Sequence, residues 1–105
     1  MNFYDQEITQ EIRENKMIEQ GGKCAACGKY FKANEKIELA HLLPQRKHIM
    51  KRYGKEIIHH PMNMKLTHSG DCNDAVQMSP NKTVLVEAHV ESIRQEIIQQ
   101  VMDRR

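Results

Sequence analysis

Apolar residues recur at helical spacing near both ends of the chain. Ile8 and Ile12 are four residues apart, and the stripe continues to Ile18, which predicts a helix over residues 3–20. Towards the other end, apolar positions separated by 4, 3, 4 and 4 residues predict an amphipathic helix over residues 82–103, namely Val86, Val90, Ile93, Ile97 and Val101. This second helix either packs within its own chain, on the first helix, or forms the seam of a homodimer.

Shorter strands and helices are expected between these two helices. The alternation over residues 36–41 predicts a strand, and residues 45–55 predict a short basic helix. Residues 56–59 are expected to form the return strand and residues 62–70 a loop. Residues 71–78 are expected to form a helix that Asp71 or Ser69 caps. His48 and His89 are expected at the surface. We find no repeat or second domain, so residues 1–105 are expected to fold as a single α+β domain.

The composition indicates a small core that needs additional stabilisation. The 105 residues are 39% hydrophobic and include three Tyr, two Phe and no Trp. A domain of this size often depends on a bound metal or on disulfides. Three cysteines cannot all pair, and the first residues resemble neither a signal peptide nor a membrane span. We therefore expect a reducing, cytoplasmic location, with no membrane partner.

Cysteine spacing indicates which metal is involved. Cys24 and Cys27 have the C-x2-C spacing of a zinc knuckle, and Cys72 lies far along the chain. His68 is the preferred fourth ligand, although His59 or His60 could replace it. Three thiolates and one imidazole complete a tetrahedral Zn2+ shell, so this zinc would be structural and would not be open for catalysis.

The net charge of +2 does not indicate a class of partner, but the position of the basic residues along the chain does. Residues 46–55 carry five basic residues and no acidic one: Arg46, Lys47, Lys51, Arg52 and Lys55. Such a segment suits a polyanion such as nucleic acid, and it is equally typical of a solvated helix face.

Three short motifs occur in order between the expected zinc ligands: Ala40-His41-Leu-Leu-Pro44, His60-Pro-Met-Asn63-Met and Cys72-Asn73-Asp74. Together they resemble the HNH endonuclease family over roughly residues 24–78. The resemblance implies a ββα-metal core, here flanked by the two end helices. It also implies hydrolysis of DNA phosphodiester bonds, as in nucleases of phages, mobile elements or defence systems.

The resemblance assigns a role to each motif. His41 would be the general base that takes a proton from the attacking water. Asn63 would brace the loop and orient that base. Asn73 would be a ligand of a catalytic divalent ion, with Mg2+ as the expected metal and Mn2+ or Ni2+ as possible substitutes.

The chain departs from the family pattern at two positions. Many members have Asp or His directly before the base as the second ligand of the catalytic ion, and here that position is Ala40. Glu38, His59 and His60 are the alternatives for this ligand. The other departure is His68, where the family usually has a cysteine.

These observations predict a metal-dependent DNA endonuclease whose basic residues 46–55 hold phosphates. One alternative is a zinc-stabilised nucleic-acid-binding module without catalysis, for which Ala40 is the best argument. A second alternative is an adaptor protein that binds a partner through its C-terminal helix.

Overall fold

The structure is a computed structural model, and it describes residues 6–79 and 81–104. Its elements, in chain order, are α1 (Gln6–Glu19), β1 (Ile37–His41), α2 (Lys47–Tyr53), α3 (Lys55–Ile58), the 3-10 turn η1 (Pro61–Asn63), β2 (Met64–His68), α4 (Asp71–Ala75) and α5 (Thr83–Asp103). Across these two ranges, no helix combines the length and the hydropathy that crossing a bilayer requires.

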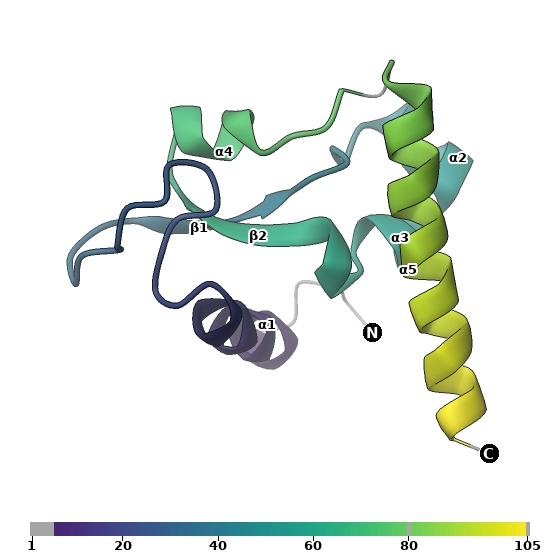
Figure 1. The fold of residues 1–105 in the computed structure, drawn as a ribbon, viewed down its shortest axis with the longest axis horizontal. Coiled ribbons are helices and arrows are strands. Elements are labelled where there is room, and N and C mark those ends of the chain that lie inside the picture. The colour runs from purple at the N-terminus through teal and green to yellow at the C-terminus, as the bar shows by residue number, and fades with distance from the viewer. Residues whose placement is uncertain (1–5, 80, 105) are drawn as a thin grey trace.

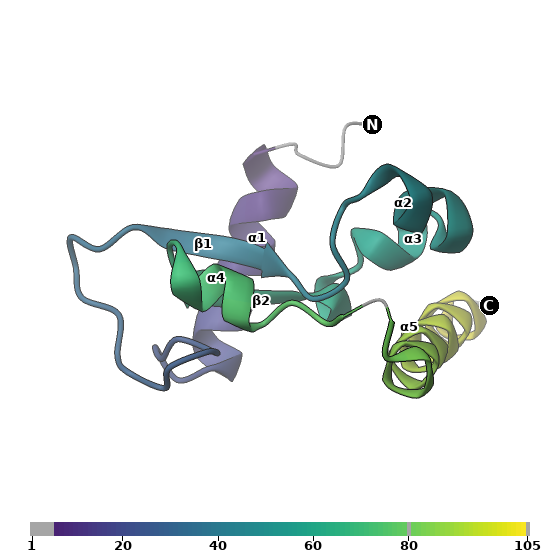
Figure 2. The ribbon, with the colours of Figure 1, turned by 90° about the horizontal axis from the view of Figure 1, so that it is seen from above.

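The centre of the fold is an antiparallel pair of strands, β1 and β2. Ile37 lies opposite His68, and His41 lies opposite Met64. Side chains alternate between the two faces of the pair. Helix α4 lies on one face and α1 on the other, as Figures 1 and 2 show. The prediction of a small α+β fold is therefore confirmed.

Helix α5 packs against the short helices α2 and α3. Its apolar face joins them in one buried cluster made of Leu43, Ile49, Ile57, Ile58, Val86, Val90 and Ile93. Figure 1 shows α5 standing beside α3 at the end of the molecule away from α4. The prediction that this helix packs within its own chain is confirmed, but its principal partners are α2 and α3 rather than α1. Exposed apolar residues remain on α5, including Ile98 and Met102, and the homodimer stays a prediction.

The expected return strand over residues 56–59 is wrong. Residues 55–58 form α3, and the strand that pairs with β1 is β2, which lies inside the segment expected to be a loop. Ile57 and Ile58 are adjacent, and both are buried in the α5 cluster. A strand would point them to opposite faces, whereas a helical turn lets both contact the core. The expectation of a loop over residues 62–70 is wrong as well. Met64 and Leu66 are two residues apart, as in a strand with one buried face, and both are buried.

The predicted ends of the other elements are close to those observed. Helix α1 begins at Gln6, and the predicted residues 3–5 lie outside the described residues. Helix α4 ends at Ala75 rather than Met78. Its N-cap residue is Gly70, which has a φ of 72°, and no side chain caps the helix. Glycine adopts this left-handed conformation without a Cβ penalty, so neither Asp71 nor Ser69 is the cap.

Asn63 joins the sheet to the α2–α3 region. It is fully buried, and its Oδ1 accepts a hydrogen bond from the Leu43 amide at 2.9 Å. Its Nδ2 donates to the carbonyls of Ile58 at 2.7 Å and Leu43 at 3.2 Å. His89 Nε2 lies 2.9 Å from the same Oδ1, so His89 is half-buried and bonded rather than a surface residue as expected.

We predict that Asn63→Ala lowers the free energy of unfolding by about 3 kcal/mol, because it leaves several buried backbone groups without partners. Urea denaturation at a fixed zinc concentration measures this change. The exposed Asn34 provides the control, and Asn34→Ala should change stability by less than about 0.5 kcal/mol. Equal stability of the two variants would contradict the bracing role of Asn63.

Candidate functional site

The four predicted zinc ligands come together from three parts of the chain. Cys24 and Cys27 lie in the turn between α1 and β1, His68 ends β2, and Cys72 is in the first turn of α4. Their ligand atoms all lie within 4.8 Å of one another. Gly28 follows the second cysteine with a φ of 74°, which turns the chain back towards β1.

The spacing of these atoms fits a tetrahedral metal. Around zinc with Zn–S bonds of about 2.3 Å, ligand atoms are separated by about 3.8 Å. His68 Nδ1 lies 3.4 Å from Cys27 Sγ and 4.0 Å from Cys72 Sγ. Cysteine sulfur and imidazole nitrogen are also the donors that zinc prefers. These four residues could hold a metal ion and are compatible with structural zinc.

Local hydrogen bonds prepare Cys24 for the thiolate form. Burial acts to raise its pKa, but backbone amides directed at the sulfur, including those of Ala26 and His68, lower the pKa to about 6. Cys72 behaves in the opposite way. Burial and the two neighbouring thiols raise the pKa of Cys72 to about 11. A bound dication favours the thiolate at both positions.

Glu35 supports the cluster from outside the ligand set, and the sequence did not reveal it. Its carboxylate lies 3.2 Å from His68 Nε2, the ring nitrogen that faces away from the sulfurs. The same carboxylate accepts a hydrogen bond from the Lys32 amide, which is the main cause of its lowered pKa. Phe31 packs edge-on against the His68 ring. A carboxylate in this place fixes the tautomer that directs Nδ1 to the metal.

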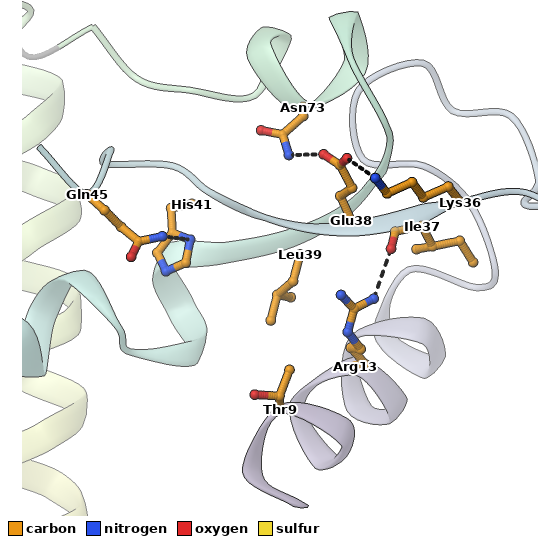
Figure 3. Close-up of a pocket in the computed structure, with 9 residues that line it drawn as sticks. All are labelled: Thr9, Arg13, Lys36, Ile37, Glu38, Leu39, His41, Gln45 and Asn73. Carbon is orange, nitrogen blue, oxygen red and sulfur yellow. Dashed lines mark hydrogen bonds and ion pairs between the residues drawn. The ribbon is translucent and has the colours of Figure 1, made fainter. Parts of the chain in front are cut away.

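A second group of predicted residues lines an open groove along β1. His41, Glu38 and Asn73 lie in one pocket of about 340 Å³, shown in Figure 3. The strand provides the first two side chains, and α4 provides Asn73. The remaining lining residues come from α1, from β1 and from the segments on either side of that strand: Thr9, Arg13, Lys36, Ile37, Leu39 and Gln45.

Glu38 and Asn73 are in direct contact within this groove. Asn73 Nδ2 donates a hydrogen bond of 2.6 Å to Glu38 Oε2, and Lys36 Nζ lies 3.7 Å from Glu38 Oε1. Figure 3 shows the Asn73 nitrogen towards the carboxylate and the oxygen away from it. A half-turn of the amide would place two oxygen donors side by side, which is the chemistry that a hard divalent cation requires.

His41 is held between two polar side chains at the other end of the groove. Its Nε2 lies 3.3 Å from His59 Nδ1, and its Nδ1 lies 3.2 Å from Gln45 Nε2. Burial lowers the pKa of His41 to about 4, and the neighbouring His59 contributes to the same shift. The imidazole is therefore neutral at pH 7 and can accept a proton.

His60 does not join this group. Its Nδ1 accepts a hydrogen bond from the Met62 amide, and burial lowers its pKa. The charges that act on it are those of Lys16 on α1 and Glu96 on α5. Of the three residues considered as the second ligand, Glu38 alone contacts Asn73 in the structure, and His59 lies against His41 instead.

The predicted basic residues lie next to the groove rather than within it. Arg46 precedes α2, and Lys47, Lys51 and Arg52 are exposed on that helix. Lys55 begins α3 and is also exposed. The cations that line the groove are Arg13 and Lys36. Sequence reasoning missed both of them because each is isolated from any motif.

Comparison with known proteins does not identify a family for this chain. No protein-family model matches it, and neither the curated proteins nor the solved structures give a significant match.

We predict that Glu35→Gln weakens zinc binding by about 10- to 100-fold, because His68 loses the carboxylate that orients it. Competition with a chromophoric chelator measures the affinity, starting from protein that retains one zinc per chain. Glu14→Gln, which changes an exposed carboxylate on α1, should bind zinc as the wild type does. An unchanged affinity in Glu35→Gln would exclude this orienting role.

Proposed function

We propose that this protein is a metal-dependent DNA endonuclease of the HNH type. One observation carries the proposal: His41, Glu38 and Asn73 line one open groove beside a cluster that could bind zinc. The three residues lie 35 positions apart at most. His41 and Asn73 belong to the motifs on which the HNH resemblance was based, and Glu38 lies two residues before the first of these motifs. The Cys3His cluster fixes α4 against the strands and would serve a structural role.

In the proposed reaction His41 removes a proton from the attacking water. A neutral imidazole in a groove that opens to solvent can accept this proton, and the attack on phosphorus then releases the 3′ oxygen. The contact with His59 holds the ring in one orientation, and the attacking water would replace the Gln45 amide at Nδ1, so that this nitrogen can accept the proton. Asn63 supports this arrangement indirectly, because its bonds to the backbone fix the segment that follows His41.

Glu38 and Asn73 would hold the catalytic divalent cation through their side-chain oxygens. Mg2+ is the expected metal for such ligands. When bound, the cation stabilises negative charge on the phosphate and on the leaving oxygen. Asn73 would need to turn its amide, and Glu38 would exchange the bonds to Asn73 and Lys36 for the metal. The basic residues of α2 would contact neighbouring phosphates, which gives weak sequence preference and strong salt dependence.

A second candidate function is a nucleic-acid-binding module without catalysis. The observation that favours it is that Glu38 already has two partners, Asn73 and Lys36, while Ala40 has no ligand atom to offer. In this case the groove would bind phosphates without holding a catalytic cation. Cleavage assays separate the two candidates.

We predict that His41→Ala lowers the rate of plasmid nicking by at least about 100-fold in Mg2+ or Mn2+, because the general base is lost. His48→Ala, which changes an exposed histidine on α2, provides the control and should cleave like the wild type. DNA binding by both variants is measured in parallel. If the wild type and His41→Ala bind DNA but are equally inert with every metal, the binding module is the correct function.

The pH dependence of cleavage follows from the low pKa of His41. Protonation removes the base, and burial moves this protonation below the ordinary value of 6.5, to about 4. We therefore predict that the acidic limb of the kcat/KM profile has its midpoint well below pH 6.5. Zinc content is measured at each pH, because thiolate protonation releases the metal. A midpoint at or above 6.5 in zinc-loaded protein would contradict the assignment of His41 as the base.

A further inference from the structure

The groove extends along β1 beyond the residues that the proposed reaction uses. His41 and Gln45 lie at one end, as Figure 3 shows. At the other end Glu38, Asn73 and Lys36 lie on one side of β1, and Arg13 lies on the other side, next to Ile37. From residue 37 to residue 41 the strand rises by about 13 Å, at about 3.3 Å per residue. Successive phosphates of one DNA strand follow each other at about 3.4 Å along the helix axis. The groove is therefore longer than a single nucleotide.

Arg13 is positioned to present a guanidinium at that far end. Its Nη1 donates a hydrogen bond of 3.0 Å to the carbonyl of Ile37, which anchors the side chain of α1 to the start of β1. Arginine has five N–H donors, and this bond uses one of them. Guanidinium groups bind phosphate oxygens with good geometry. The anchor also lowers the entropy that Arg13 would lose on binding a ligand.

Lys36 adds a second positive charge at the same end. Its side chain is 79% exposed, and its partner is Glu38 at 3.7 Å. An exposed ion pair of this kind contributes little free energy, so Lys36 can exchange it for a phosphate at low cost. The exchange would become more favourable if Glu38 held a cation.

We propose that Arg13 and Lys36 form a phosphate-binding site beside the Glu38–Asn73 pair, where they hold the DNA strand next to the bond to be cleaved. The inference rests on the proposed function and extends it, because it makes α1 part of the substrate site. The strand would then run the length of the groove, from Arg13 and Lys36 past His41 to the basic residues of α2. The substrate would be a polynucleotide rather than a mononucleotide.

The test measures binding of a fluorescein-labelled 16-base-pair DNA duplex by anisotropy, in the His41→Ala background and without chelators. We expect Arg13→Gln and Lys36→Gln each to weaken binding several-fold at about 0.1 M salt. Each should also reduce the slope of log K against log salt by about 1, because one phosphate contact is lost. Arg94→Gln on α5 is the matched control and should leave both quantities unchanged, because Arg94 does not line the groove.

Arg13→Gln also removes the bond to Ile37, so Lys36→Gln and Arg13→Lys keep the test independent of folding. Arg13→Lys retains the charge and should bind more tightly than Arg13→Gln. Thermal melting and zinc content are recorded for every variant. If Arg13→Gln and Lys36→Gln bind with wild-type affinity and salt slope, or lose affinity only as far as Arg94→Gln does, the phosphate site is excluded.

The outcomes for this site and for the proposed nuclease are separable. Cleavage that depends on His41, with normal DNA binding by Arg13→Gln and Lys36→Gln, would remove the phosphate site and keep the nuclease. Weakened binding in these variants, with no cleavage by the wild type in any metal, would keep the phosphate site and remove the nuclease.

Discussion

The Cys3His cluster is the constraint on which the rest of the site depends. The sheet has two strands, and a pair this small has little buried area of its own. A metal ion held by the cluster would tie the turn after α1 to the end of β2 and to the start of α4. Because α4 is a helix of five residues with no side-chain cap, its position would rely on this tie. Asn73 follows Cys72 directly, so the same tie would hold Asn73 at Glu38.

A second constraint acts at the opposite end of the strands. Asn63 is buried among backbone groups of the segments that follow β1 and α3, and it bonds to both. It therefore positions the chain just beyond His41, while the α5 cluster holds α2 and α3 in place. The groove lies between these two constraints. His41 lies next to the Asn63 constraint, and the Glu38–Asn73 pair lies next to the Cys3His cluster, so a small protein can keep all three side chains in one pocket.

The electrostatic character of the groove changes along its length. Glu38 is the acidic residue among the lining residues, and it lies between the cations Arg13 and Lys36 and the neutral imidazole of His41. Exposed cations on α2 continue beyond His41. Positive charge therefore lies at both ends of the groove, and a carboxylate lies between them. The proposed phosphodiester ligand would match this order of charges.

The sequence by itself determined the end helices, the first strand and the four residues that could hold a metal ion, and it singled out the motifs that contain His41, Asn63 and Asn73. These are local signals: helical periodicity, alternation, C-x2-C spacing and short motifs all lie within a few residues. It misplaced the return strand, because Ile57 and Ile58 look alike in a strand and in a buried helical turn. Only the tertiary structure showed that Glu38 contacts Asn73, and only it brought Glu35 to His68 and Arg13 to β1. Those contacts join residues that are far apart in the chain or carry no motif, and their distances are set by packing rather than by spacing along the sequence.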